Sequence, residues 1–181
     1  MKKFTLVQKL RNKIKVKGKL ILCISKSAKI VNCVIISKGI NNQLLIGDET
    51  TARHVTIEIV GNNCSIDIGQ NCILGEGSYL SAKEGKHILV GDECMFSRNA
   101  KIMTSDGHPI FQNNVLVNQA KDIRIENNVW LADNVTILKG VHIGKNSVVG
   151  INSTVTKNIV SSTIVAGNPA KEVKNMITWS Q

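Results

Sequence analysis

The sequence predicts an all-β domain that winds as a parallel β-helix, with one protruding loop and short terminal helices. Composition is the first observation, because hydrophobic residues make up 43% of the 181 positions and aromatic residues only 3%. Ile, Val and Leu must therefore fill the core, and such branched side chains favour strands. The second observation is that apolar residues recur at fixed intervals, first of 22 positions and later of six. Fixed periods of this kind are typical of solenoids.

The longer period covers residues 22–102. One apolar row has a residue every 22 positions, at Ile24, Ile46, Ile68 and Val90. A second row lies two positions earlier, at Leu22, Leu44, Ile66 and Ile88. A third lies twelve positions later, at Ile36, Glu58, Leu80 and Ile102. Glu58 breaks this third row, and we expect Ile57 or Ile59 to take its place in the core.

The shorter period begins at residue 125, where apolar residues stand at strict intervals of six: Ile125, Leu131, Ile137, Ile143, Val149 and Val155. Three hexads make one triangular coil of about 18 residues, so each 22-residue coil has about four extra residues, which follow its third strand. Ile102 and Ile125 are 23 positions apart rather than six, which leaves 17 extra residues there. The insertions should therefore stack on one edge, with the longest at residues 103–124.

These periods divide the chain into three parts. Residues 1–21 are a basic N-terminal segment, with an amphipathic helix over 2–13 that caps the solenoid. Residues 22–169 form the β-helix with its inserted loop at 103–124. Residues 170–181 are predicted as a C-terminal helix, with an apolar stripe of Val173, Met176 and Ile177. Glycines that follow aliphatic positions, such as Gly47 and Gly91, are expected at corners that need unusual backbone angles.

The net charge of +10 is concentrated at the N-terminal end. Residues 1–47 contain 11 Lys or Arg and no acidic residue, which gives +11; residues 48–181 contain 12 basic and 13 acidic residues, which gives −1. This end is suited to an anionic membrane surface or a polyanionic substrate, or it is simply a solvated terminus. Nucleic acid is disfavoured, because the basic segment lacks interleaved aromatic residues for base stacking.

The cysteine pattern and the hydropathy of the chain predict a cytoplasmic protein. The number of cysteines is odd and no CxxC pair occurs, which favours reduced, buried thiols over a disulfide framework or a zinc site: Cys23, Cys33, Cys64, Cys72 and Cys94. The first ten residues lack the continuous apolar core of a signal peptide. No apolar stretch approaches the length of a transmembrane helix.

Residues 122–174 resemble the C-terminal half of the maltose, galactoside and polysaccharide O-acetyltransferases. These enzymes belong to the left-handed β-helix, or hexapeptide-repeat, acyltransferase family. The motifs that carry the resemblance are Asn128-Val129-Trp130-Leu131, Lys139-Gly140-Val141, Val155-Thr156-Lys157 and Ala166-Gly167-Asn168-Pro169-Ala170. The resemblance implies left-handed winding and a homotrimer, with acetyl-CoA in the cleft between neighbouring prisms. One departure is Leu131-Ala132-Asp133, where relatives usually have Ile-Gly and a small residue.

The resemblance places catalysis in the inserted loop, at Ser105-Asp106-Gly107-His108-Pro109. His108 matches the catalytic histidine of the family, and imidazole suits a general base because its pKa lies near neutrality. The alternative is a loop histidine packed at a subunit interface. Asp106 is a candidate to orient or support His108, although Ser-Asp-Gly is also ordinary turn chemistry. Trp130 should point outward and contact acceptor or cofactor, as the matching residue does in relatives, with plain packing at an interface as the alternative.

By the same resemblance, five residues line the path of coenzyme A: Ala132, Ile151, Thr156, Lys157 and Lys171. Lys157 is the candidate for a phosphate contact and Lys171 for the nucleotide end, although a single lysine is more often only solvated. No metal site is predicted. The other histidines, His54, His87 and His142, do not have the spacing of the β-helical carbonic anhydrases, which bind metal through three histidines.

The resulting prediction is an acetyl-CoA-dependent O-acetyltransferase that modifies a sugar hydroxyl on a surface polysaccharide or its precursor. The acceptor is then an anionic or membrane-linked saccharide, met by the basic N-terminal end at the inner membrane surface or in the cytoplasm. The first alternative is N-acetylation of an amino group on a nucleotide-linked sugar. The second is a non-catalytic β-helical scaffold, which the histidine loop, Trp130 and Lys157 disfavour.

Overall fold

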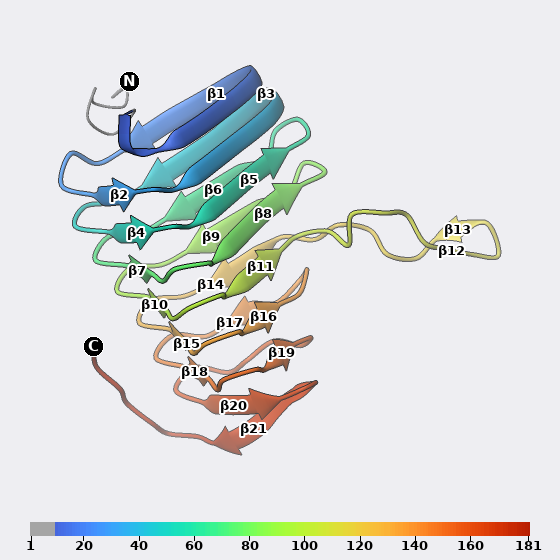
Figure 1. Ribbon diagram of the computed structural model, residues 1–181. Helices are drawn as coiled ribbons and strands as arrows, with labels where there is room; N and C mark the ends of the chain where they lie inside the picture. Colours follow the sequence, from blue (N-terminus) through green and yellow to red (C-terminus); the bar gives the residue numbers. More distant parts are fainter. Residues whose placement is uncertain (1–9) are drawn as a thin grey trace.

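The chain winds through short parallel strands that stack from coil to coil into a prism (Figure 1). This computed structural model describes residues 10–181. From Lys13 onward, every secondary-structure element assigned in these residues is a strand. The prediction of an all-β parallel β-helix of hexapeptide repeats is therefore confirmed. A long loop leaves one side of the prism, as predicted (Figure 1).

The prism has three faces, which we name A, B and C, and each full coil passes over them in that order. Face A contains the C-terminal halves of β1 (Lys13–Ile24) and β3 (Val34–Ile46), then β6 (Ser65–Ile68), β9 (His87–Val90), β14 (Ile123–Ile125) and β17 (His142–Ile143). Face B contains β2 (Lys29–Val31), β4 (Thr51–Arg53), β7 (Ile73–Leu74), β10 (Met95–Phe96), β15 (Trp130–Leu131), β18 (Val148–Val149), β20 (Ile164–Gly167) and β21 (Ala170–Lys174). Face C contains the N-terminal halves of β1 and β3, then β5 (Thr56–Val60), β8 (Tyr79–Lys83), β11 (Lys101–Met103), β16 (Thr136–Ile137) and β19 (Thr154–Val155).

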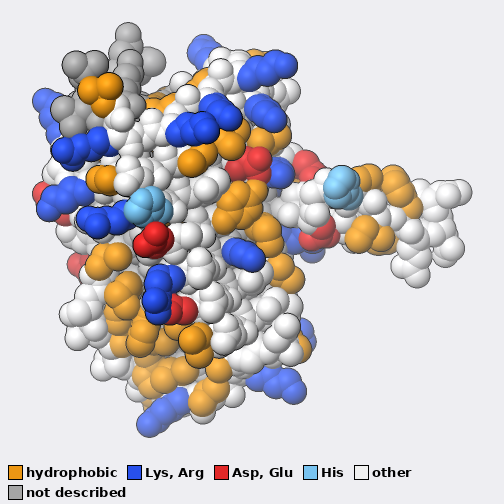
Figure 2. All heavy atoms as spheres, in the orientation of Figure 1, with side chains coloured by type: hydrophobic (Ala, Val, Ile, Leu, Met, Phe, Trp, Pro, Cys, Tyr) orange, Lys and Arg blue, Asp and Glu red, His pale blue; other side chains and the backbone are white. Residues whose placement is uncertain are grey.

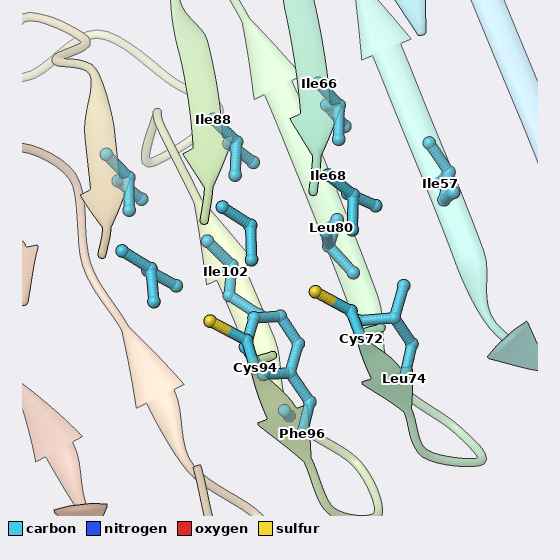
Figure 3. Close-up of a cluster of buried hydrophobic side chains, with 14 of the residues drawn as sticks. Ile57, Ile66, Ile68, Cys72, Leu74, Leu80, Ile88, Cys94, Phe96 and Ile102 are labelled. Carbon is cyan, nitrogen blue, oxygen red and sulfur yellow. The ribbon is translucent and has the colours of Figure 1, made fainter. Parts of the chain in front are cut away.

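The predicted apolar rows lie in register in the core, with one correction. On face A the aligned residues are Ile24, Ile46, Ile68, Val90, Ile125 and Ile143. On face C the inward row is Ile35, Ile57, Leu80, Ile102, Ile137 and Val155. Ile57 therefore fills the place left by Glu58, as expected, but Ile36 faces outward and its neighbour Ile35 is the buried residue. Figure 3 shows members of both rows, among them Ile57, Ile68, Leu80 and Ile102, pointing into the space between the strands together with Phe96.

Glu58 lies on the outer surface of face C, where its carboxylate has several partners. The Tyr79 hydroxyl donates to it, Ser81 donates over 3.2 Å, and the Lys83 ammonium lies 3.0 Å away. Burial raises the pKa of Glu58, but the hydrogen bonds from Tyr79 and Lys83 outweigh it, so the pKa lies below its ordinary value. The charged residue that interrupts the apolar row thus has a compensating network outside the core.

The corners between strands depend mainly on asparagine rather than glycine. Asn128, Asn134, Asn146 and Asn152 all have φ between 54° and 61°, a left-handed conformation that Asn tolerates. Their amides form ladders between coils, with Asn134 donating to Asn152 over 3.0 Å. Gly47 and Gly91 do not have left-handed φ values, so the prediction of unusual angles there was wrong. These glycines are needed for space instead, because a Cβ on Gly47 would lie 2.6 Å from the backbone of Gly69.

The insertions stack on the edge between faces C and A, as predicted. In Figure 1 the β5–β6 and β8–β9 connections project on the same side as the long loop. That loop runs between β11 and β14 and contains a two-stranded antiparallel hairpin of β12 (Phe111–Gln112) and β13 (Val115–Leu116). A hydrogen bond of 3.0 Å from the Lys121 amide to the Thr104 carbonyl closes its neck.

Both predicted chain ends need correction. Residues 170–181 are not helical, because 170–174 form β21, which pairs antiparallel with β20 and satisfies the backbone of the last face B strand. At the other end β1 begins at Lys13, so the solenoid includes residues that we had assigned to a separate basic segment. The predicted helix over 2–13 lies largely outside the described residues. Within residues 10–181 there is no helix long and apolar enough to cross a bilayer.

Gly39→Ala should be strongly destabilising. Gly39 has a φ of +113° and an added Cβ would lie 2.0 Å from the Gly61 carbonyl oxygen, so the substitution combines backbone strain with a backbone clash. We expect the free energy of unfolding to fall by about 3–5 kcal/mol. Gly85→Ala is the matched control, since its φ is +70° but the nearest atom is 3.5 Å away; it should cost only about 1–2 kcal/mol. Equal losses for the two variants in urea denaturation would contradict this account.

Candidate active site

His108 lies at the start of the long loop, where the chain has just left β11. The loop is first attached to the insertion above it, because the Ser105 hydroxyl donates to the carboxylate of Glu84 in the β8–β9 turn. The same hydroxyl accepts the Gly107 amide over 3.0 Å, and Gly107 has a φ of +87° that allows the chain to turn. His108 therefore follows a short, hydrogen-bonded turn rather than an unsupported stretch.

Asn118 closes this turn from the returning side of the loop. Its side-chain amide donates to the His108 carbonyl over 2.8 Å and to the Asp106 carboxylate over 2.9 Å. Its side-chain oxygen accepts the Ile110 amide over 2.7 Å. Lys139, from the next coil, donates to the Asn118 carbonyl over 2.8 Å and also pairs with Asp106. We name Asp106, Asn118 and Lys139 the loop clasp, because together they fix both sides of the loop to the prism.

Asp106 is linked to His108 only through this clasp, because Asn118 donates both to the Asp106 carboxylate and to the His108 carbonyl. Hydrogen bonds from Lys139 and then from Asn118 hold the pKa of Asp106 below its ordinary value. The ion pair therefore stabilises the loop above the ordinary carboxyl pKa and is lost as the pH falls through the lowered one. Among the described residues, no hydrogen bond joins the Asp106 carboxylate to the imidazole of His108. Direct orientation of the ring by Asp106, as first envisaged, is not seen in this structure.

A hollow of about 260 Å³ opens beside His108. It is lined by Glu84, Ser105, His108, Pro109, Leu116 and Asn118. A histidine, a glutamate and a serine thus line one small space, and a positioned histidine is the side chain that most often serves as a general base. Sequence reasoning missed Glu84, Asn118 and Lys139, because Glu84 reaches the loop only through stacking of insertions and Asn118 is one of several asparagines nearby.

Trp130 lies on a different side of the prism, at the start of β15 on face B. Its side chain points outward, as predicted, and is half-buried. The indole nitrogen donates to the Ser97 hydroxyl over 3.1 Å. The ring packs against Trp179 with 5.8 Å between centroids and 40° between planes.

The predicted cofactor residues lie on two edges rather than in one cluster. Ala132 and Ile151 follow β15 and β18, so they stack on the edge between faces B and C. Thr156 and Lys157 follow β19 on the edge between faces C and A, which is the edge of the His108 loop. Lys171 is in β21 on face B and is exposed. Within one chain, the structure therefore does not bring these residues, Trp130 and His108 to a common point.

Asp133 explains the departure from the family motif at Leu131-Ala132-Asp133. Its carboxylate accepts the Arg98 backbone amide over 2.9 Å and pairs with the Arg98 guanidinium at 2.6 Å. The guanidinium and the amide hold the pKa of Asp133 below its ordinary value. The acidic residue thus ties two coils together beside Ala132.

The remaining histidines each have a local partner. His54 lies 3.2 Å from Glu76, His87 lies 2.8 Å from the Ser65 hydroxyl, and His142 lies 2.9 Å from Glu126. In residues 10–181 no group of three or more His, Cys, Asp or Glu side chains is placed to hold a metal ion.

Comparison with known proteins identifies similar transferases. The family model for the bacterial transferase hexapeptide (six repeats) matches residues 122–157. A polysialic acid O-acetyltransferase of Escherichia coli O1:K1 / APEC is 36% identical over 160 residues, which are 87% of this chain and 44% of that protein. The corresponding enzyme of Neisseria meningitidis is 37% identical over 119 residues, or 65% of this chain and 54% of that protein. The chain thus spans about half the length of these relatives.

Two further comparisons cover more of the matched protein. The putative acetyltransferase YJL218W of Saccharomyces cerevisiae is 32% identical over 151 residues, which are 75% of this chain and 76% of that protein. The crystal structure of the polySia specific acetyltransferase NeuO superimposes with a TM-score of 0.76 and 30% sequence identity, and covers 96% of this chain and 84% of that one.

Asn118→Ala should release the His108 turn without unfolding the prism. The substitution removes hydrogen bonds to His108, Asp106 and Ile110. Because each is worth about 1 kcal/mol, we expect amide hydrogen exchange in residues 104–118 to accelerate by tenfold or more, roughly. Gln112→Ala, in the exposed hairpin, is the control and should leave exchange at the turn unchanged. Unchanged protection in Asn118→Ala would show that the clasp does not hold the loop.

Proposed function

Since the chain belongs to the hexapeptide-repeat transferase family, we propose that it moves an acetyl group from acetyl-CoA to a sugar hydroxyl of a polysaccharide. One structural observation supports the proposed general-base chemistry. His108 is held by the loop clasp beside a hollow that also presents Glu84 and Ser105. The resemblance supplies the acyl donor, and the relatives in the comparison that are named as O-acetyltransferases supply the reaction type.

In this reaction the His108 imidazole removes the proton from the acceptor hydroxyl as its oxygen attacks the thioester carbonyl. The carbonyl oxygen gains negative charge, which backbone amides at the coil corners are suited to stabilise. Collapse of the tetrahedral intermediate breaks the carbon–sulfur bond and returns the proton from the imidazolium to the CoA thiolate. One imidazole can perform both transfers, because it accepts the proton in the first step and donates it in the second. The loop clasp contributes by fixing the backbone from which the imidazole projects.

A homotrimer supplies what one chain lacks. The loop hairpin exposes apolar side chains that residues 10–181 of the same chain leave largely uncovered, among them Phe111 at 62% and Val115 at 64%. Figure 2 shows this apolar arm standing clear of the prism. A neighbouring copy would cover the arm and set its own coils against His108. In that arrangement acetyl-CoA lies between chains, with Ala132, Ile151 and Thr156 along its path, Lys157 at a phosphate and Lys171 at the nucleotide end.

The acceptor is proposed to be an anionic polysaccharide. Two of the relatives act on polysialic acid, an acidic polymer, according to their names. In this chain Lys15 and Lys17 occupy alternate positions of β1, and with Lys38 they line a hollow of about 490 Å³ on face C. Glu58 also lines this hollow, but its carboxylate is paired with Lys83. Face C is the face from which the His108 loop departs, and Figure 2 shows lysine and arginine gathered over β1 and β3. Lysines also protect an edge strand such as β1 from unwanted pairing. A role of Lys15 and Lys17 in binding the acceptor is therefore tested by substitution.

We place the reaction in the cytoplasm, where acetyl-CoA is available, with association of the basic first coil with the inner membrane surface as the alternative location. N-acetylation of a nucleotide-linked amino sugar remains the alternative reaction. A screen of purified protein for acetyl-CoA consumption with anionic polysaccharides, neutral oligosaccharides and amino-sugar nucleotides separates the two. Turnover with the amino-sugar nucleotides alone would replace the proposed reaction.

His108→Ala should abolish most of the activity while the fold persists. Removal of a general base typically costs about 10²–10⁴-fold in rate, so we expect kcat to fall at least ~100-fold. His54→Gln is the control, because His54 lies on another corner and pairs with Glu76. Circular dichroism and gel filtration check that both variants fold and assemble like the parent. A folded His108→Ala protein with undiminished acetyl transfer would exclude the assigned role.

The double variant Lys15→Gln/Lys17→Gln should raise the KM for an anionic polysaccharide and weaken its dependence on salt. The physical reason is the loss of two cations from the face C hollow, whose attraction for a polyanion is screened by ions. Lys26→Gln/Lys29→Gln removes the same charge from the other side of the first coils and is the matched control. If the two double variants changed the KM equally, the polysaccharide would be attracted by the overall charge and would not bind along face C.

A further inference from the structure

The last seven residues run back across the coils instead of ending beside β21. Figure 1 shows this tail rising beside face B from the last coil toward β10. The Ile177 amide donates to the Ser162 carbonyl over 3.0 Å. Further along, the Trp179 indole donates to the Asn128 carbonyl over 2.8 Å, and the Gln181 side chain to the Glu93 carbonyl over 3.2 Å. The acceptors lie at the same corner in different coils, so we name residues 175–181 the C-terminal strap.

The strap brings the two tryptophans of the chain together. Trp179 packs on Trp130 at a centroid distance of 5.8 Å. Asn128 binds the strap twice, because its carbonyl accepts the Trp179 indole and its side-chain amide donates to the Trp179 carbonyl over 3.4 Å. Asn128 also stands two residues before Trp130, so the strap is fixed to the same corner that sets the start of β15.

Trp130 is consequently restrained at two places. The Ser97 hydroxyl accepts its indole N–H over 3.1 Å, and the Trp179 ring packs against its ring system. A tryptophan side chain that has one hydrogen bond and one aromatic contact retains little freedom about χ1 and χ2. Without Trp179 the Ser97 hydrogen bond would be the only specific contact on the ring among those described.

Closure of the solenoid end does not explain the strap. β21 already pairs with β20 and covers the last strand of face B. Most strap residues are exposed, and Met176 reaches 92% exposure, whereas Ile177 and Trp179 are half-buried. Of the two half-buried residues, Trp179 packs on Trp130, and Ile177 bonds through its amide to Ser162 at the same edge of the last coil.

We infer that Trp179 is a positioning residue of the acetyl-transfer site, which acts by holding the Trp130 ring in place through the C-terminal strap. The inference rests on the proposed function and on the family resemblance, by which Trp130 contacts the acceptor or the cofactor. Trp179 does not need to touch the substrate in this role. Its contribution is to present Trp130 in one orientation, so that a sugar ring or acyl chain meets a fixed aromatic surface.

Steady-state kinetics of Trp179→Ala, Trp179→Phe and Met176→Ala test the inference. We expect Trp179→Ala to raise the acceptor KM by about threefold to tenfold, since losing the aromatic pair that holds Trp130 can weaken its contact with substrate by up to about this factor. Trp179→Phe keeps a ring against Trp130 and should recover most of the loss. Met176→Ala changes an exposed side chain in the same strap and should match the parent. Wild-type KM and kcat in Trp179→Ala, with an active parent, would overturn the inference.

Fluorescence gives a readout that does not depend on activity. Trp130 is the sole tryptophan in both Trp179→Phe and Trp179→Ala. Iodide should quench Trp130 more strongly in Trp179→Ala, because its ring has lost the cover of an aromatic side chain. Equal quenching in the two variants would overturn the inference even if the kinetics changed. A parent protein without acetyl transfer would instead refute the proposed function, and the quenching comparison would still decide whether the strap holds Trp130.

Discussion

Parallel hydrogen bonding between successive coils is the constraint on which the rest of this structure depends. Each strand pairs with the strand one coil above and one coil below, so every coil must return to the same register whatever its length. On face A the aligned residues Ile46, Ile68, Val90, Ile125 and Ile143 are separated by 22, 22, 35 and 18 positions. Extra residues must therefore leave and rejoin the prism at one corner, where no ladder is interrupted.

This constraint explains why a long loop is compatible with a rigid scaffold. Loop-closure entropy grows only slowly with length, and the neck of the loop is already fixed by the backbone bond between Lys121 and Thr104. The loop clasp then restrains the part that contains His108, through Asn118 and the Lys139 ammonium, which is mostly buried. A site on an insertion thus gains the precision that is usual for residues on regular elements.

The sequence predicts the features that recur in every coil. It does not predict positions where two neighbouring residues, or two kinds of secondary structure, compete. Inward rows such as Ile24–Ile46–Ile68 are visible because the period forces the same residue type into each coil. The position beside Glu58 stayed ambiguous because Ile57 and Ile59 are both apolar and both point inward. The apolar residues near the C-terminus have helical spacing, but a short isolated helix is only marginally stable. Pairing of β21 with β20 provides backbone hydrogen bonds to an existing sheet and is therefore favoured.

The site was predictable to a similar extent and for similar reasons. His108 and Trp130 stand in recognisable motifs, so their positions could be inferred from the chain alone. Asn118, Glu84 and Trp179 could not, since each acts across a loop or from a coil that is distant in sequence. Their partners are fixed only when the insertions stack and the strap folds back. Polar loop residues have no periodicity from which such contacts can be read.

The separation of the site residues around the prism has a mechanical consequence. His108 projects from the edge between faces C and A, whereas Trp130 lies on face B and Ala132 on the edge between faces B and C. Under the proposed trimer these groups meet only between chains, and any looseness in one chain would add to that of its neighbour. The loop clasp fixes the backbone of His108, and the C-terminal strap fixes the ring of Trp130, each within its own subunit. The conformational entropy of the His108 backbone and of the Trp130 side chain is then lost on folding, before substrate binds, which favours a preorganised site.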